Sequence, residues 1–174
     1  MARALRIQFE GAVYHITSRG NERREIFKDD ADRIRFLEIL KLSLGIYQVL
    51  LYGYVLMDNH YHLLVETPKG NISEFMRRFN ITYTSYFNKK HNRAGHLYQG
   101  RYQSILVDKE SYLTSLSRYI HLNPIRVREL IDQPAKEKEE HLKEYSWSSL
   151  SGYINEDTKL PENGVKPLVL AMGI

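Results

Sequence analysis

The sequence predicts an α+β fold of the ferredoxin-like or RRM-like kind, in which an antiparallel sheet carries its helices mainly on one face. Strand-like and helix-like segments follow one another in the order β-α-β-β-α-β-α. Two of the strand segments are neighbours separated by a short turn, which indicates a hairpin. With 43% hydrophobic residues, the 174-residue chain has enough apolar material for one core.

The first half of the chain supplies three predicted strands and a helix. Residues 11–20, GAVYHITSRG, alternate as a strand does. One face of this strand carries Val13, His15 and Thr17. Residues 31–45 have apolar positions at helical spacing, and they follow a polar, basic loop. Residues 47–57 and 60–68 are rich in Tyr, Val and Leu, and Asp58–Asn59 forms the turn of the predicted hairpin.

Polar and glycine residues mark the expected helix ends. Asp29 or Asp30 can cap the first helix, and Gly45 is expected to stop it. Asn71 with Glu74 resembles a capping box, which opens a long second helix that the sequence HNRAG ends. These signals place the second helix directly after the hairpin.

The remaining elements follow the second helix. Residues 97–108 predict a further strand with a glycine break, and residues 109–122 predict a third helix that Asp108 can cap. Pro124 disfavours helical geometry at Asn123, so this helix should end there. The chain is therefore expected to divide into a domain over residues 1–131 and a charged linker with a C-terminal tail over residues 132–174, the tail packing on the body.

Charge is unevenly distributed between these two parts. Residues 1–131 hold 20 Lys and Arg against 13 Asp and Glu, whereas residues 132–174 hold 5 against 8. A basic body with an acidic tail suits an anionic partner such as nucleic acid. A merely solubilising surface is the alternative that charge alone leaves open.

Several classes of protein are disfavoured. The chain has no cysteine, so disulfides, thiolate zinc sites and cysteine nucleophiles are excluded. Its first residues lack the apolar stretch of a signal peptide, and no uncharged run is long enough to span a membrane. We therefore expect a cytoplasmic protein, associated with the nucleoid if its partner is DNA, and no membrane partner.

Two histidines stand one residue apart in the third predicted strand. Residues i and i+2 of a strand share a face, so His60 and His62 point the same way. Their ring nitrogens are then close enough to share one divalent ion, given a third ligand from elsewhere. A hydrogen-bonded pair of structural histidines is the alternative, and the motif alone favours it.

A second cluster, SRYIHLNP, ends the third helix. Tyr119 and Asn123 are four residues apart, one above the other on the helix. Tyr119 borders the apolar stripe and is expected to point towards the body. A half-buried core tyrosine is the simpler interpretation, although the amide of Asn123 can offer an oxygen to a metal.

Four segments together resemble a known family. VYHITSRGNERREIF, GYVLMDNHYHLLVE, LYQGRYQSILV and RYIHLNPIRV are similar to the single-tyrosine HUH transposases, and most of all to their REP-associated tyrosine transposase branch. The resemblance runs from about Val13 to Val127. Because several motifs occur in the right order and spacing, it favours the functional interpretation of both clusters.

The resemblance implies a role for each matching residue. His60 and His62 match the metal-binding HUH histidines, Tyr119 matches the nucleophile, and Asn123 matches the polar residue that completes the metal site, where better-known relatives have glutamine. The implied enzyme is a bacterial mobile-element transposase that cuts and rejoins single-stranded DNA through a 5′-phosphotyrosine. It uses Mg²⁺ or Mn²⁺ and no ATP, because the covalent bond conserves the energy of the phosphodiester.

The implied substrate is DNA with a hairpin and adjacent single-stranded bases, as in repetitive extragenic palindromes. Phosphate contacts are expected from basic side chains. The candidates are Arg19, Arg23, Arg24, Arg77, Arg78, Lys89, Lys90, Arg93, Arg101, Arg126 and Arg128. Exposed aromatic rings can stack on unpaired bases, for which the candidates are Tyr83, Tyr86, Tyr98 and Tyr102.

Three other functions remain as alternatives at this level. An RNA-recognition-like binding module would need exposed aromatic residues on the sheet face, where His60 and His62 lie instead. A hydrolytic nuclease would keep the metal but not the covalent step, and a domesticated palindrome-binding protein would cut only weakly. The sequence leaves monomer and homodimer both open.

Overall fold

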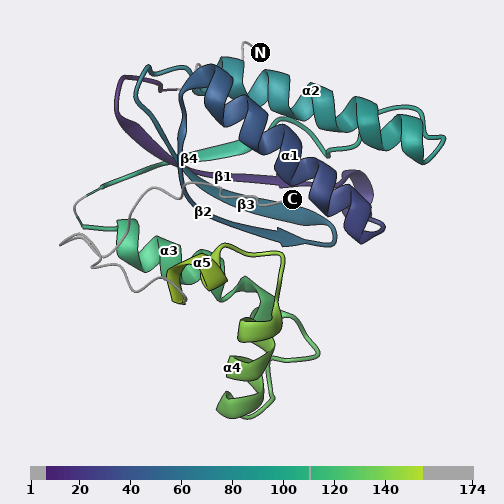
Figure 1. The fold of residues 1–174 in the computed structure, drawn as a ribbon, viewed down its shortest axis with the longest axis vertical. Coiled ribbons are helices and arrows are strands. Elements are labelled where there is room, and N and C mark those ends of the chain that lie inside the picture. Colours follow the sequence, from purple (N-terminus) through teal and green to yellow (C-terminus); the bar gives the residue numbers. More distant parts are fainter. Residues whose placement is uncertain (1–6, 110, 155–174) are drawn as a thin grey trace.

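The computed structural model describes residues 7–109 and 111–154, so the predicted tail segment 155–174 lies outside the described residues. A four-stranded antiparallel sheet has the strand order β2-β3-β1-β4 (Figure 1), which confirms the predicted fold class. The strands are β1 (Ala12–Arg19), β2 (Leu50–Met57), β3 (His60–Thr67) and β4 (Gln103–Val107). The helices are α1 (Asp30–Tyr47), α2 (Ile72–Lys90), α3 (Leu113–His121), α4 (Ala135–Glu144) and α5 (Leu150–Ile154), with short 3₁₀ turns η1 (Asn21–Arg23) and η2 (Asn123–Arg126).

The sheet is covered on both faces. Helices α1 and α2 pack together on one face over the larger core, which includes Tyr14, Phe36 and Phe79 (Figure 1). Helix α3 lies on the other face over a smaller core that includes Val55 and Leu64. The expected one-sided arrangement therefore holds for the two long helices, while α3 forms a second layer on the opposite face.

The centre of the sheet joins the first strand to the predicted histidine strand. β1 pairs with β3 along its whole length, and this register sets Thr17 opposite His62 and Arg19 opposite His60. Gly20 ends β1, where its N–H donates to the Asn59 carbonyl at 2.8 Å. A Cβ on Gly20 would lie 2.0 Å from the Arg24 carbonyl oxygen, so the tight exit from β1 requires glycine.

One predicted helix end and one predicted side-chain cap are wrong. Helix α1 continues through Gly45 to Tyr47, and Gln48 adopts the left-handed conformation that closes it, with φ of 53°. Helix α2 begins at Ile72 with Asn71 as its N-cap residue, as expected, but the capping box does not form, because the Asn71 amide donates to the Tyr47 carbonyl at 2.9 Å. Both signals were local, whereas the turn from α1 into β2 and its contact with Asn71 decide the outcome.

One of the two predicted acidic caps is confirmed. Asp29 accepts a hydrogen bond from the Asp32 N–H at 2.9 Å at the start of α1, and so satisfies an amide that has no partner within the helix. Asp108 accepts a hydrogen bond from the Ser111 N–H at 3.1 Å, but Ser111 lies before α3, whose N-cap residue is Tyr112. The prediction that Asp108 caps α3 is therefore wrong, because the helix begins one turn later than expected.

The described part of the C-terminal tail packs against the edge strand β2. The Leu56 N–H donates to the Trp147 carbonyl at 2.8 Å, and the Ser149 N–H donates to the Tyr54 carbonyl at 3.0 Å. The Tyr145 hydroxyl donates to the Leu56 carbonyl at 2.6 Å. This short stretch covers backbone groups that an edge strand would otherwise expose. Among the described residues, no helix is long and apolar enough to span a membrane.

Candidate active site on the sheet

The two histidines of β3 lie on the sheet face that α3 covers. The partners of His62 on the neighbouring strands are Thr17 of β1 and Val55 of β2, and Val55 belongs to the core under α3. The rings of His60 and His62 meet edge to face, with centroids 5.2 Å apart. The His62 side chain is buried and that of His60 is half-buried. The predicted shared face is therefore observed.

Both imidazoles are neutral at pH 7. Burial lowers the pKa of His60 to about 4, and the nearby charge of Arg19 adds to this effect. Burial also lowers the pKa of His62 to about 3, with further contributions from the neighbouring histidines and Arg19. A metal ligand must present an unprotonated nitrogen, so this environment favours the ligating form of both rings.

Helix α3 brings Tyr119 to the histidines. Leu113, Leu116 and Ile120 are buried against the sheet and fix the helix in place. This orientation leaves Tyr119 40% exposed at the side of the interface. Its ring lies edge-on to His62, with centroids 6.1 Å apart. A surface-accessible tyrosine is thus held beside the buried imidazole of His62.

A cation covers the face of the same tyrosine. The guanidinium carbon of Arg126, in η2, lies 4.5 Å from the centroid of the Tyr119 ring. This geometry is a cation–π contact, which restrains the ring and places positive charge beside it. Arg126 is exposed, so its guanidinium is also open to an incoming phosphate.

Asn123 follows α3 one turn beyond Tyr119. Its amide nitrogen donates to the carbonyl of Tyr119 at 2.9 Å and to that of Ile120 at 3.2 Å. The nitrogen therefore caps the helix end, and the amide oxygen is the atom available for a ligand. The structure ties Asn123 to the same helix end as the tyrosine.

The donor set suits a divalent ion of intermediate softness. His60 and His62 supply two neutral imidazoles, whereas no group of three His, Cys, Asp or Glu side chains in residues 7–109 and 111–154 is arranged so that it could hold a metal ion. A third protein ligand would have to be of another kind, as the Asn123 oxygen is. Imidazole nitrogens suit Mn²⁺ better than Mg²⁺, which prefers oxygen.

Sequence reasoning did not assign a site role to two β1 residues that lie in this cluster. His15 Nε2 is 2.8 Å from His62 Nδ1, and the Thr17 hydroxyl is 3.2 Å from the same nitrogen. The His15 ring also lies edge-on to Tyr119, with centroids 6.2 Å apart. The alternation of β1 put both residues on one face, but only the pairing of β1 with β3 sets that face beside His62.

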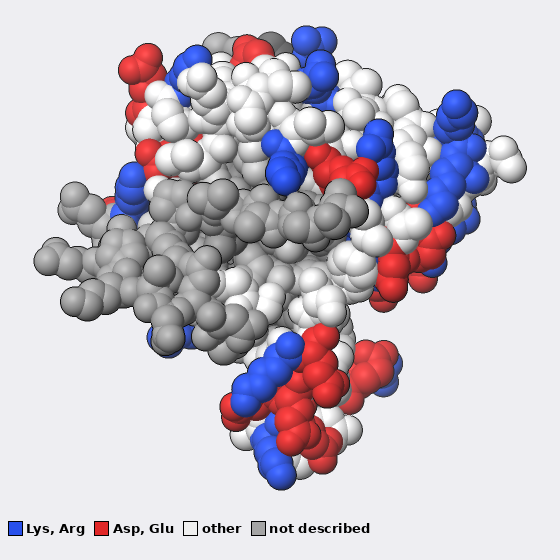
Figure 2. All heavy atoms as spheres, in the orientation of Figure 1, with Lys and Arg blue, Asp and Glu red and all other residues white. Residues whose placement is uncertain are grey.

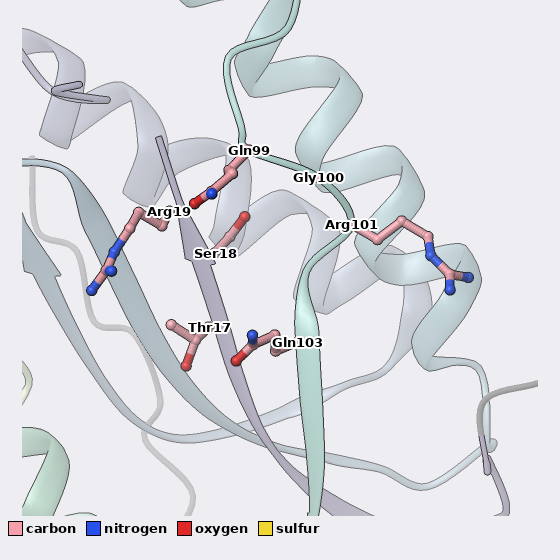
Figure 3. Close-up of a pocket in the computed structure, with 7 residues that line it drawn as sticks. All are labelled: Thr17, Ser18, Arg19, Gln99, Gly100, Arg101 and Gln103. Atoms are coloured by element: carbon pink, nitrogen blue, oxygen red, sulfur yellow. The ribbon is translucent and has the colours of Figure 1, made fainter. Parts of the chain in front are cut away.

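A pocket of about 360 Å³ adjoins the cluster at the β1–β4 edge (Figure 3). Thr17, which contacts His62, is one of its walls. The other lining residues are Ser18, Arg19, Gln99, Gly100, Arg101 and Gln103. Figure 3 shows that the Arg101 side chain extends away from Thr17 and Gln103. Two amides and a guanidinium therefore border an open space beside the histidines.

The predicted DNA-binding residues fall into two groups. Arg19, Arg101 and Arg126 belong to the pocket or to the tyrosine cluster. The others lie in η1 and the loop after it, on or just after α2, or beyond η2; they are Arg23, Arg24, Arg77, Arg78, Lys89, Lys90, Arg93 and Arg128. Arg77, Arg78, Lys89 and Lys90 are on α2, which covers the sheet face opposite the histidines.

Some of these cations already have partners. Lys90 forms ion pairs with Asp29 at 2.6 Å and with the buried Asp32 at 2.8 Å, and Arg24 pairs with Glu22 at 2.5 Å.

Figure 2 also shows basic and acidic side chains intermingled on α4. Ion pairs at (i, i+4) spacing account for this pattern on α4, so that helix does not form a basic surface.

The tyrosines that were candidates for base stacking are mostly part of the core. Tyr83, Tyr98 and Tyr102 are buried, and Tyr86 packs against the same core while partly covered. The stacking prediction is therefore wrong for the three buried rings.

Comparison with known proteins is consistent with this architecture. The family model described as IS200-like transposase matches residues 8–123. A solved structure of a REP-associated tyrosine transposase bound to a REP hairpin is similar to 88% of this chain and 86% of that chain, with a TM-score of 0.67 and 14% identity. A transposase candidate from Deinococcus radiodurans is similar over 68% of this chain and 95% of that chain, with a TM-score of 0.48 and 17% identity. No curated protein matches the chain.

Proposed function

The chain belongs to the family of IS200-like transposases, and we propose that it cuts and rejoins single-stranded DNA near hairpins through a 5′-phosphotyrosine on Tyr119. The observation that carries this proposal is the ring contact of the exposed Tyr119 with two buried histidines, His15 and His62, together with the guanidinium of Arg126 over its face. The alternative of an RNA-recognition-like module has less support, because α3 covers the sheet face on which it would bind.

In the proposed reaction, one bond from phosphorus to oxygen forms and one breaks. The Tyr119 oxygen attacks the scissile phosphate and loses its proton, and the bond from phosphorus to the 3′ oxygen breaks. That oxygen takes up a proton and leaves as a 3′-hydroxyl, while the downstream strand stays attached to the tyrosine by its 5′-phosphate. Attack by a 3′-hydroxyl on the phosphotyrosine reverses the step and joins two strands without ATP.

The residues around Tyr119 have separate tasks in this step. Arg126 holds the ring and offsets negative charge that develops on the tyrosine and the phosphate. Asn123 caps α3 through its amide nitrogen and so fixes the helix end from which both side chains project. His60, His62 and the Asn123 oxygen would hold Mg²⁺ or Mn²⁺. Such an ion, when bound, polarises the scissile phosphate.

The pocket beside the histidines fits the flanking strand of such a substrate. Its volume of about 360 Å³ is enough for part of a nucleotide. Gln99 and Gln103 offer both donors and acceptors for a base edge, and Arg19 offers a charge for a phosphate. We therefore place the unpaired bases next to the hairpin along the β1–β4 edge. The similar transposase bound to a REP hairpin supports hairpin DNA as the substrate class.

The experiment is a cleavage assay on three labelled DNAs. These are a hairpin with single-stranded flanks, the flanks without the hairpin, and the same sequence as a blunt duplex. We expect cleavage of the first only, with Mn²⁺ or Mg²⁺ present, and no cleavage after chelation. Equal cleavage of all three, or cleavage that a chelator leaves unchanged, would contradict the proposed substrate or the proposed metal respectively.

A further inference from the structure

A third imidazole supports the pair of proposed metal ligands. His15 lies on β1, and its ring is nearly parallel to that of His62, with centroids 5.0 Å apart and planes 15° apart. The two nitrogens that meet, His15 Nε2 and His62 Nδ1, are 2.8 Å apart. Both side chains are buried, with 8% and 6% exposed. The distance is that of a hydrogen bond between two largely buried imidazoles.

A hydrogen bond between two neutral imidazoles needs one donor and one acceptor. If His62 Nδ1–H donates to His15 Nε2, the other nitrogen of His62, Nε2, keeps its lone pair. If His15 donates instead, neutral His62 carries its proton on Nε2 and cannot bind a metal through that atom. The direction of this single bond therefore decides whether His62 is a ligand.

The neighbouring hydroxyl is compatible with the first arrangement. Thr17 Oγ1 lies 3.2 Å from His62 Nδ1, because Thr17 is the register partner of His62. A proton on Nδ1 has two acceptors there, His15 Nε2 and the hydroxyl oxygen. If Nδ1 carried a lone pair instead, both neighbours, the His15 Nε2–H and the Thr17 hydroxyl, could donate to it. A single lone pair accepts only one good hydrogen bond, so one of these donors would lose its partner.

We propose that His15 is a positioning residue that accepts the Nδ1–H of His62, and so holds Nε2 of His62 unprotonated and aimed at the divalent ion. Metal-binding histidines usually donate their second N–H to a carboxylate, carbonyl or water, and here a neutral imidazole takes that place. The inference rests on the metal site of the proposed function. It adds a residue of β1 to a site otherwise built from β3 and the end of α3.

The first test reads the tautomer directly in the metal-free protein. Long-range ¹H–¹⁵N spectra of ¹⁵N-histidine-labelled wild type should show His62 with a protonated Nδ1 and an unprotonated Nε2. Spectra of His15→Phe and His62→Gln assign the signals. A protonated Nε2 on His62 in the wild type would overturn the proposal, whatever the activity of the protein.

The second test measures Mn²⁺ affinity from the electron paramagnetic resonance signal of free Mn²⁺. His15→Phe keeps a ring of similar size but has no acceptor, and we expect Mn²⁺ to bind about 10- to 100-fold more weakly. His15→Gln retains an acceptor oxygen and should restore most of the affinity. His121→Phe is the matched control, because His121 is also a buried, hydrogen-bonded histidine, 2.8 Å from the Ser149 hydroxyl.

The outcomes separate this inference from the proposed function. If wild type binds Mn²⁺ and cleaves DNA while His15→Phe binds Mn²⁺ equally well, the role of His15 is wrong and the function stands. If wild type binds no Mn²⁺, the metal site fails and the inference fails with it. Equal weakening in His15→Phe and His121→Phe would mean a general loss of packing and would also overturn the proposal.

Discussion

At the residue scale, Tyr119 differs from the other tyrosines by its surroundings. Tyr14, Tyr61 and Tyr83 are fully buried in the main core. Tyr112, two turns before Tyr119 and also exposed, marks the start of α3. Tyr119 alone among these combines exposure with ring contacts to His15 and His62. Access for a substrate and proximity to the imidazoles together support the proposed role of Tyr119 as nucleophile over that of a core residue.

Arg126 is expected to contribute to the rate of adduct formation, although an exposed arginine usually contributes little. Replacing Arg126 by Ala removes the cation over the Tyr119 ring and should slow formation of the protein–DNA adduct by roughly 5- to 30-fold, equivalent to about 1–2 kcal/mol. Arg128→Ala is the control, since Arg128 is an exposed arginine two residues later. Single-turnover adduct formation measures both rates. Equal rates for Arg126→Ala and wild type would rule out this role.

Period-two spacing was enough to predict that His60 and His62 share a face, because alternation is a property of any strand. It was not enough to find His15 as their neighbour. That contact depends on β1 lying next to β3 with Thr17 opposite His62, and register is a property of the whole sheet. The same limit applies to Arg126, whose contact with Tyr119 depends on the turn η2.

At the scale of elements, a charged cluster joins the start of α1 to the end of α2. The Asp32 side chain is fully buried, and it accepts hydrogen bonds from the Lys28 N–H, Lys90 and His91. Lys90 also pairs with the capping residue Asp29. These contacts account for the close packing of the two helices at this end, and they engage a lysine that the sequence had assigned to DNA.

Lys89 and Lys90 should therefore behave differently. Lys90→Ala leaves the Asp32 carboxylate with fewer partners and should lower the free energy of unfolding by roughly 1–3 kcal/mol. Lys89→Ala, at an exposed position next to it, should change it by less than about 0.5 kcal/mol. Urea denaturation measures both. Equal stabilities of the two variants would show that the Lys90 ion pairs contribute little.

The elements themselves were largely predictable, whereas the end of α1 and the side-chain cap of α2 were not. Alternation and helical spacing identified four strands, the hairpin turn at Asp58–Asn59 and three helices. Gly45 failed as a helix stop because α1 extends to reach the turn into β2, and Asn71 failed as a cap because its amide bonds to Tyr47. Tertiary contacts outweigh local preferences of this size.

At the scale of the whole molecule, the main hydrophobic core and the proposed active site lie on opposite faces of the sheet. The α1–α2 face holds the larger core, whereas the α3 face holds the histidines and Tyr119. The tail returns from α4 to cover β2, with α5 beside α3 (Figure 1). The sequence predicted a charged linker and a tail that packs on the body, and in the described part of that tail residues 147–149 pair with the backbone of β2.

Buried neutral histidines should make the fold sensitive to mild acid. Burial lowers the pKa values of His15, His60, His62 and His121 below the ordinary value near 6.5. The unfolded chain therefore binds more protons below about pH 6.5, and the free energy of unfolding should fall from there towards pH 4. Each such histidine contributes a slope of up to about 1.4 kcal/mol per pH unit.

His121 offers a test of this effect away from the histidine–tyrosine cluster. The pKa of His121 is lowered to about 4, mainly by burial. Urea denaturation at pH 7.5, 6.0 and 5.0 should show a shallower loss of stability for His121→Gln than for wild type. Parallel curves for the two proteins would contradict the assignment of a neutral buried His121.

One chain contains every residue of the proposed site. Tyr119 contacts His15 and His62 of the same chain, so the nucleophile should act in cis. Mixing His60→Ala with Tyr119→Phe should then give no more adduct than either variant alone. Adduct restored by mixing would show instead that the site combines a tyrosine of one subunit with the histidines of another.

The most direct measurement asks whether Tyr119 becomes attached to DNA. Wild type, Tyr119→Phe and Tyr112→Phe are each incubated with Mn²⁺ and a hairpin DNA labelled downstream of the cut, then separated on a denaturing gel. The account predicts a labelled adduct for wild type and Tyr112→Phe and none for Tyr119→Phe, with the adduct peptide containing phosphorylated Tyr119. DNA cleavage by Tyr119→Phe without any adduct would contradict it and would indicate a hydrolytic nuclease.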